Sequence, residues 1–259
     1  MKIGFIGAGR VATHLATKLF TNYQIVQIFS RHLTHATRLA EYINAQPIDD
    51  LNQIDPEIEL LIISVNDQAI STVVEQLKQL NFKGLVVHTS GSTHIDVLAK
   101  SFSRTGVFYP LQTFSFESKI NWQQTPLFIE AHDVKDREIL YQLATFLSQK
   151  VYEYTSEQRL SLHLAAVFAC NFSNYCYAIS KQILDQSQVD FSLLHPLMLE
   201  TARKATFTDP QDVQTGPASR GDLNIIQMHQ EMLQTQNETN FLAVYQLLSA
   251  QIMKKYEKN

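Results

Sequence analysis

The chain has 259 residues, of which 45% are hydrophobic and 18% charged, with a net charge of −4. This balance is typical of a globular protein with a large core, and it excludes wholesale disorder, collagen-like structure and coiled coils. The negative charge and the absence of a long Lys/Arg run argue against binding to nucleic acid or to a membrane surface. The longest apolar stretches are shorter than the ~18 residues of a membrane-spanning helix, so no membrane span is expected.

The cysteines and the N-terminus indicate the compartment. Cys170 and Cys176 are six residues apart, which places them on opposite sides of a helix, so they should not form a disulfide. The N-terminus runs directly into Lys2-Ile3-Gly4-Phe5-Ile6-Gly7, and no secretory signal peptide is expected. Two thiols without a disulfide framework suit a reducing cytoplasm. No metal site is expected.

Short apolar runs alternate with helical patterns over residues 1–154. This alternation predicts βαβ units that form a Rossmann-type, doubly wound, mostly parallel sheet with helices on both faces. The expected strands are Ile3–Ile6, Ile25–Phe29, Leu60–Val65, Leu85–His88, Val107–Tyr109, Leu127–Ala131 and Val151–Tyr154. The expected helices are Val11–Phe20, Thr34–Ile43, Ala69–Leu80 and Lys135–Ser148.

After the last of these strands the pattern becomes helical throughout. Residues 156–184 predict one long helix, with Thr155 or Ser156 as its N-cap and Glu157 in the first turn. Residues 164–170 are apolar on every side of this helix, so we expect them to be buried all round. Further helices are expected at about Ser192–Thr206, Asp222–Gln234 and Glu238–Tyr256.

The change of pattern divides the chain into two domains. We predict an α/β domain over residues 1–154 and an all-α domain over residues 155–259. The length agrees with this division, because domains average roughly 150 residues.

Glycine is scarce, with only 8 residues in the chain, yet three of them fall within the first nine positions. The segment Gly7-Ala8-Gly9-Arg10-Val11-Ala12 matches G-x-G-x-x-G/A between an expected strand and an expected helix. The first glycine permits a tight turn, the second lets the backbone approach a pyrophosphate, and the helix N-terminus favours the phosphate charge. We therefore predict dinucleotide binding by residues 7–11. The alternative is a strand-to-helix turn that merely needs small residues.

The end of the second strand indicates which dinucleotide is bound. NAD sites usually place Asp or Glu there to bind the ribose hydroxyls, but no acidic residue lies between Thr21 and Ala40. Arg31 instead offers a planar cation for a 2′-phosphate, beside the hydroxyl of Ser30. This favours NADP over NAD, and FAD is disfavoured for the same reason. The alternative is that Arg31 is a solvated surface charge.

Ligands of doubly wound sheets bind outside the carboxyl ends of the strands, and two loops are expected there. The first contains Asn66, which is placed to line the cofactor, and Asp67, for which capping of the next helix is the favoured interpretation over cofactor contact. The second begins at His88 and contains Ser90, which is expected near the cofactor. His88 is a candidate for polarising a carbonyl, or it bonds a neighbouring backbone group. Residues 109–114 are a candidate wall of the cleft.

Polar residues interrupt the long apolar helix. His163 and Asn174 are about 20° apart on a helical wheel, and Asn171 is about 80° from His163. Buried polar groups need partners, which are either neighbouring helices or a substrate. A neutral imidazole at His163 suits acid or base catalysis.

A second glycine cluster, at residues 215–222, interrupts the helices. Asp222 is a good N-cap for the helix that follows. Arg220 lies between Gly216 and Gly221 and is a candidate cation for a substrate carboxylate or phosphate. The alternative is a plain loop between helices.

Residues 6–11, 88–91, 108–114, 163–174 and 215–222 together resemble a bacterial family of Rossmann-like proteins described as NADP oxidoreductases, with a C-terminal helical domain of unknown function. That family is similar in plan to pyrroline-5-carboxylate reductase, the deazaflavin-dependent NADP reductases and the β-hydroxyacid dehydrogenases. The resemblance implies that the helical domain forms a homodimer and closes a cleft over the nicotinamide. β-Hydroxyacid dehydrogenases carry a catalytic Lys four residues before an Asn, whereas Val167 stands four residues before Asn171 here.

These observations lead to one prediction and one rival. We predict an NADP-dependent oxidoreductase that transfers hydride to a small, anionic carbonyl or imine substrate between the two domains. His88, His163 and Asn171 would orient or protonate the substrate, and Arg220 would anchor its negative charge. The rival is a non-catalytic NADP-binding sensor, or partner-binding dimer, on the same scaffold.

Overall fold

The computed structural model describes residues 1–235 and 238–256. They form two compact units, one of residues 1–169 and the other of the described residues from 170 onward. The first unit extends beyond the predicted domain boundary at residue 154 because helix α6 (Ser156–Ala166) packs on the sheet, where Leu162 contacts a buried cluster that contains Tyr109 and Phe128.

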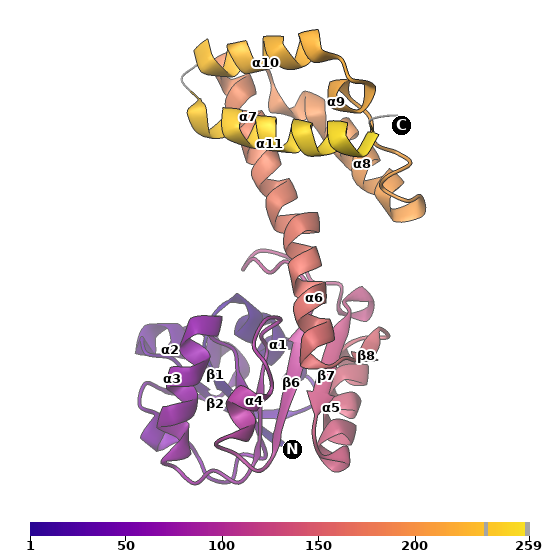
Figure 1. Cartoon of the computed structure of the whole chain (residues 1–259). Helices are drawn as coiled ribbons and strands as arrows, with labels where there is room; N and C mark the ends of the chain where they lie inside the picture. Colours follow the sequence, from indigo (N-terminus) through magenta and orange to yellow (C-terminus); the bar gives the residue numbers. More distant parts are fainter. Residues whose placement is uncertain (236–237, 257–259) are drawn as a thin grey trace. The chain divides into compact units, whose positions relative to one another are not determined.

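The first unit contains an eight-stranded sheet in the order β3-β2-β1-β4-β5-β6-β7-β8, of which β1, β2, β6, β7 and β8 are labelled in Figure 1. All neighbouring strands are parallel except β6 and β7, which are antiparallel. The order 3-2-1-4-5-6 is that of the Rossmann fold, so the predicted fold class is confirmed. The strands are β1 (Lys2–Ile6), β2 (Gln24–Phe29), β3 (Gln46–Ile48), β4 (Leu60–Ile63), β5 (Leu85–His88), β6 (Thr105–Pro110), β7 (Leu127–Ala131) and β8 (Val151–Glu153).

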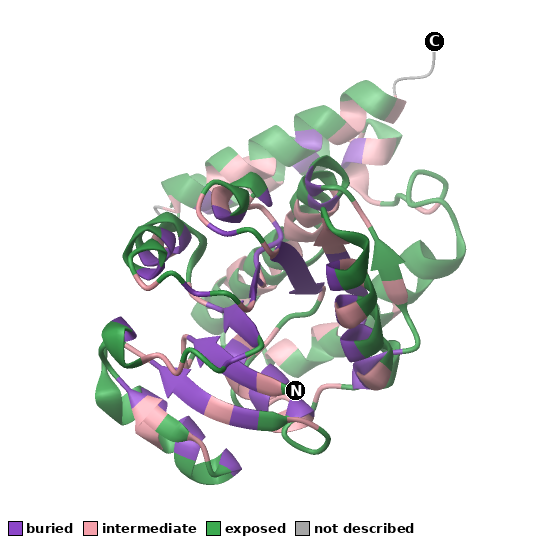
Figure 2. Cartoon of the chain, turned by 90° about the horizontal axis from the view of Figure 1, so that it is seen from below, coloured by how far each residue is buried: buried purple, intermediate pink, exposed green. Residues whose placement is uncertain are grey.

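Helices cover both faces of this sheet. One buried cluster joins α1, α2 and α5 to one face, and another joins α3 and α4 to the opposite face. Side chains alternate along β4 between these clusters, as the two-residue period of a strand requires, and Figure 2 shows the central strands as buried. The helical elements are α1 (Arg10–Leu19), α2 (Leu33–Ile43), η1 (Leu51–Gln53), α3 (Asp67–Lys78), α4 (Asp96–Ala99), η2 (Trp122–Gln124) and α5 (Val134–Leu147).

The sequence prediction missed strand β3, which lies at the edge of the sheet. This strand has three residues, and its middle residue is Pro47. Proline cannot donate to a strand ladder and is tolerated only at edges, so its presence argued against a strand. β3 nevertheless pairs with β2 in parallel register, with Phe29 opposite Ile48.

The second unit is helical, and no strand follows β8 within the described ranges. Helices α10 and α11 lie side by side in Figure 1 and are joined by hydrogen bonds between His229 and Tyr245 and between Gln246 and Gln230. No helix in the described part of the chain is long and apolar enough to cross a membrane. The elements are α7 (Ser173–Gln186), η4 (Phe191–Leu194), α8 (His195–Phe207), α9 (Pro217–Arg220), α10 (Leu223–Thr235) and α11 (Thr239–Tyr256).

The predicted long helix starts as expected but differs in its middle. Thr155 is the N-cap of α6 and forms a capping box with Gln158. A π-helical segment, η3 (Val167–Phe172), then separates α6 from α7. The expectation of burial on every side is wrong for this chain, because Leu164 is 58% exposed. An apolar helix surface is covered only where other elements pack on it, and within this chain they leave Leu164 uncovered.

Candidate functional site

The glycine loop between β1 and α1 has the backbone that the motif predicts. Gly7 has a φ of +114°, and its N–H donates to the carbonyl of Phe29 at 2.8 Å. A Cβ atom on Gly7 would overlap the carbonyl of Ser64, so only glycine fits this turn. A Cβ on Gly9 would meet nothing within 4 Å. The backbone beside Gly9 therefore faces open space in which a phosphate can approach.

The N-terminus of α1 offers donors to such a phosphate. Gly9 is the N-cap and provides no side-chain cap, and the first turn has no acidic residue. The first bond within the helix runs from the N–H of Thr13 to the carbonyl of Gly9 at 2.9 Å. The N–H groups that precede Thr13 in the first turn lack partners within a helix, which is the general basis of anion binding at helix N-termini.

The end of β2 carries the two residues predicted to bind a 2′-phosphate. Ser30 directly follows Phe29, whose carbonyl accepts from Gly7, and the hydroxyl oxygen of Ser30 accepts from the N–H of His32 at 3.3 Å. Arg31 is exposed, and within residues 1–235 and 238–256 it makes no ion pair. Its guanidinium is thus available to an anion.

The loops after β4 and β5 are tied together by side chains. The hydroxyl of Thr89 donates to that of Ser64 at 3.2 Å, and the hydroxyl of Ser92 donates to the carboxylate of Asp67. The predicted capping of α3 by Asp67 is wrong. The N-cap is Asn66, and Asp67 is the first helical residue. Its carboxylate binds the neighbouring loop instead of the helix N–H groups.

His88, the last residue of β5, is fully buried. Its Nδ1 accepts from the N–H of Ser90 at 3.2 Å, while Nε2 has no partner among the described residues. Burial, followed by the charge of Arg159, lowers the pKa of His88 from 6.5 to about 3. The imidazole is therefore neutral at physiological pH, with its proton on Nε2, because Nδ1 accepts a hydrogen bond.

His163, on α6, lies against the end of β6. Its Nδ1 is 3.2 Å from the hydroxyl oxygen of Tyr109. Gly91 lies against both rings, because a Cβ atom there would be 2.6 Å from Nδ1 of His163 and 2.7 Å from Cζ of Tyr109. The predicted residues His88, Ser90 and His163 thus belong to one region at the carboxyl ends of β5 and β6.

Sequence reasoning missed the residue that anchors α6 to the sheet. Arg159 is 1% exposed and forms an ion pair with Glu130 of β7. Its Nη2 atom also donates to the carbonyl of Thr93 at 2.5 Å. Ser156 donates to the Glu130 carboxylate from its N–H at 3.0 Å and from its hydroxyl at 2.8 Å. The sequence signal was a single Arg in a predicted first turn, which is normally an exposed position.

Two predicted site residues, Asn171 and Arg220, lie in the second unit. Asn171 is exposed and lies within the π-helical segment η3. Its predicted wheel angle from His163 is wrong, because i→i+5 turns break the α-helical period. Arg220 forms an ion pair with Asp222 at 2.8 Å, so an anion would have to compete with that carboxylate. Asp222 directly precedes α10, as expected of an N-cap. The substrate roles of Asn171 and Arg220 stay predictions.

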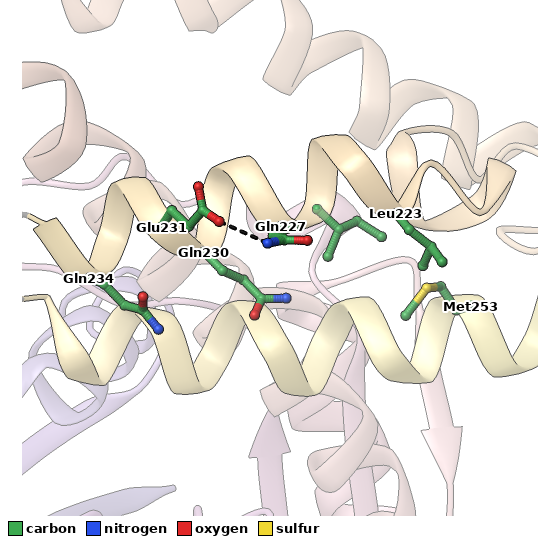
Figure 3. Close-up of a pocket in the computed structure, with 7 residues that line it drawn as sticks. Leu223, Gln227, Gln230, Glu231, Gln234 and Met253 are labelled. Atoms are coloured by element: carbon green, nitrogen blue, oxygen red, sulfur yellow. Dashed lines mark hydrogen bonds between the residues drawn. The ribbon is translucent and has the colours of Figure 1, made fainter.

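A groove of about 470 Å³ lies along helices α10 and α11 (Figure 3). It is lined mainly by amide and apolar side chains, and Gln227 donates to Glu231 at its rim at 2.9 Å. It includes none of the residues predicted to bind cofactor or substrate. In the parts of the chain that the structure describes, no group of three or more His, Cys, Asp or Glu residues could hold a metal ion.

Two family models match the chain. A Rossmann-like domain matches residues 1–113, and a domain of unknown function, DUF2520, matches residues 125–252. No curated protein matches the chain. The first match confirms the sequence assignment of the glycine loop to a Rossmann-like domain.

Solved structures share this organisation over their full length. A Bacteroides fragilis protein named as a putative NADP oxidoreductase is 39% identical, with 98% of each chain covered and a TM-score of 0.91. A Thermotoga maritima protein is 24% identical, with 99% of this chain and 100% of that chain covered and a TM-score of 0.78. A pyrroline-5-carboxylate reductase from Coxiella burnetii shares the fold at 16% identity, with 99% of this chain and 98% of that chain covered and a TM-score of 0.57.

Proposed function

The chain belongs to the family whose members join a Rossmann-like domain to a DUF2520 domain, and we propose that it is an NADP-dependent oxidoreductase. Its substrate is a small, anionic carbonyl or imine compound. The observation that carries the proposal is the glycine loop, with Gly7 at a positive φ in its tight turn and the open backbone at Gly9. The 39% identity to a protein named as a putative NADP oxidoreductase supports it.

The residues at the loop fit a dinucleotide. Gly9 leaves space for the pyrophosphate, and the N–H groups that open α1 are the donors that bind it. Ala8, Arg10 and Val11 complete the loop, and Arg10 is held over the ring of Phe116 at 5.9 Å. Asn66, Asp67 and Ser90 are further cofactor contacts in this proposal. When bound, the reduced nicotinamide supplies a hydride, which requires a nearby acceptor carbon and a source for one proton.

The preference for NADP over NAD rests on Arg31 and Ser30. Arg31 is an exposed cation with no carboxylate partner in the described ranges, which suits a 2′-phosphate. Calorimetric titration with NADPH and NADH tests it. NADPH should bind more tightly to the wild type, and Arg31→Ala should remove that preference, whereas the control Lys83→Ala should keep it. Tighter binding of NADH to the wild type would refute the role of Arg31.

His88 and His163 supply the polar groups at the substrate end. His88 is neutral at physiological pH and serves as a hydrogen-bond donor from Nε2, not as a proton carrier. In carbonyl reduction, hydride would form the new C–H bond, the C=O π electrons would move onto oxygen, and that oxygen would take up one proton from solvent water. His163 and Asn171 orient the substrate during this step, and Arg220 anchors its negative charge.

The rival function, a non-catalytic NADP sensor, is favoured by Val167 at the position where β-hydroxyacid dehydrogenases carry a lysine. Turnover assays with keto acids, hydroxy acids and cyclic imines discriminate the two. Turnover that is lost in His163→Ala and Asn171→Ala, with NADPH binding retained, supports the enzyme. Binding of NADPH without turnover of any of the three substrate classes supports the sensor.

The second unit exposes apolar side chains that suit a homodimer interface. The exposed set is 62–79% accessible and lies on η4 and α8; it comprises Leu193, Leu197, Leu199 and Phe207. Burial of such side chains stabilises association. Light scattering should give a mass of twice 29.6 kDa for the wild type, and Leu197→Asp combined with Leu199→Asp should reduce it to the monomer. A monomeric wild type would contradict the dimer.

A further inference from the structure

Tyr109 and His163 form a hydrogen-bonded pair between the sheet and α6. The hydroxyl oxygen of Tyr109 is 3.2 Å from Nδ1 of His163, and the ring centroids are 6.1 Å apart at an angle of 69°. Gly91 lies so close that any side chain there would strike both rings. The loop after β5, which contains Gly91, therefore packs against both rings of the pair.

The direction of this hydrogen bond follows from the environment of Tyr109. The residue is only 9% exposed. Burial raises the pKa of Tyr109 to about 12, and the negative charge of Asp67 acts in the same direction, so the phenol keeps its proton. Among the described residues, His163 is the only hydrogen-bond partner of this hydroxyl. The phenolic O–H has no other acceptor among the described residues, so we assign it as the donor and Nδ1 of His163 as the acceptor.

The tautomer of His163 follows from this direction. In a neutral imidazole, one ring nitrogen carries the proton and the other accepts. With Nδ1 as acceptor, the proton lies on Nε2. Within residues 1–235 and 238–256, Nε2 of His163 makes no hydrogen bond, so its N–H is available to a ligand.

The same face of α6 is fixed one turn earlier in the helix. Arg159 and His163 are four residues apart, which places them on one side of the helix. The Arg159 side chain is bound by Glu130 and by the carbonyl of Thr93. The contacts of Arg159 fix the helix backbone near His163, and the hydrogen bond to Tyr109 fixes the orientation of the His163 ring.

We propose that Tyr109 is a positioning residue that holds His163 as the neutral tautomer protonated on Nε2, and that this N–H donates a hydrogen bond to the oxygen of a carbonyl substrate. This inference rests on the proposed oxidoreductase function and narrows its substrate class. A carbonyl oxygen accepts hydrogen bonds, and it gains negative charge as hydride adds. An iminium ion, the form of an imine that takes up hydride, has no lone pair on nitrogen to accept one.

The tautomer is measured by ¹⁵N NMR on the full-length protein labelled at its nine histidines. The His163 signals are assigned by their loss in His163→Gln. In neutral wild-type His163, Nε2 should be protonated and Nδ1 unprotonated. Tyr109→Phe should shift both nitrogen signals toward the tautomer mixture of free imidazole. The control Tyr154→Phe, in the adjoining ring cluster beside Phe128, should change neither signal. A wild-type proton on Nδ1, or an unchanged spectrum in Tyr109→Phe, overturns the role of Tyr109.

The carbonyl assignment has its own readout, which is separate from the tautomer and from cofactor binding. With NADPH, the protein should reduce carbonyl substrates in preference to cyclic imines. Tyr109→Phe should lower kcat for the carbonyl by about tenfold with little change in the affinity for NADPH. Reduction of imines alone overturns the carbonyl assignment. Failure of NADPH to bind would refute the proposed function, while the NMR result would still decide the tautomer.

Discussion

His88 makes the stability of the protein depend on pH in a calculable way. It is fully buried at the end of β5, and burial, followed by the charge of Arg159, lowers its pKa from 6.5 to about 3. The unfolded chain therefore binds a proton at His88 over a pH range in which the folded chain does not. Stability from this residue is fully present above pH 6.5 and is lost as the pH falls toward 3.

The size of the effect follows from the two pKa values. Between these values, each pH unit costs ~1.4 kcal/mol, because one proton separates the two states. When the pH is lowered from 7 to 5, about one and a half units of the change lie below the unfolded pKa of 6.5. The free energy of unfolding should therefore fall by about 2 kcal/mol. A variant without His88 lacks this titrating group. Its free energy of unfolding should therefore fall by about 2 kcal/mol less than that of the wild type between pH 7 and pH 5.

Urea unfolding at pH 7 and pH 5 measures the difference for the wild type and for His88→Gln. Comparing each protein with itself at two pH values removes the constant cost of the substitution. His35→Gln, at an exposed position, is the matched control and should follow the wild type. Equal losses in the wild type and in His88→Gln would refute the reasoning, because His88 would then titrate alike in both states.

Three further predictions concern the surroundings of this residue. Gly91→Ala should lower the free energy of unfolding by ~1–3 kcal/mol, because its Cβ meets His163 and Tyr109; an unchanged urea midpoint would mean that both rings move without cost. Arg159→Met should destabilise by ~3–5 kcal/mol, because Glu130 loses its buried cation. Thermal and urea unfolding measure this loss, and a change no larger than that of Arg137→Met, whose half-exposed side chain pairs with Glu153, would contradict it. Ser92→Ala should weaken the link between α3 and the β5 loop by ~1 kcal/mol, and equal urea midpoints for Ser92→Ala and the wild type would show that this hydrogen bond adds no stability.

Elements with a strong period were predictable from the sequence. The strand and helix periods placed β1, β2, β5 and β7 to within one residue. The glycine loop was recognised because the motif requires a strand before it and a helix after it. Both properties are local, since a few consecutive residues carry each of them. Strand β3 was missed because Pro47 contradicts the local preference and only the sheet edge permits it.

The parts of the candidate site that depend on distant residues were not predictable. Arg159 meets Glu130 across 29 positions, and Asp67 meets Ser92 across 25. Neither pair has a periodic or compositional signal. The π-helical segment that contains Asn171 likewise has no signature in the residue pattern, so the helical wheel was drawn with the α-helical period. The sequence predicted which strand ends carry the candidate site residues. The contacts among the side chains at those ends could be found only from the folded structure.

The central claim is hydride transfer from NADPH, and turnover tests it most directly. The measurement is the rate at which the wild-type protein consumes NADPH in the presence of small anionic carbonyl compounds, followed by absorbance, with mass spectrometry of the reduced product. The account predicts consumption that depends on the carbonyl compound, yields one reduced product per NADPH and is abolished in Gly7→Asp. Saturable binding of NADPH without product from any carbonyl or imine compound would contradict the enzyme and favour the sensor.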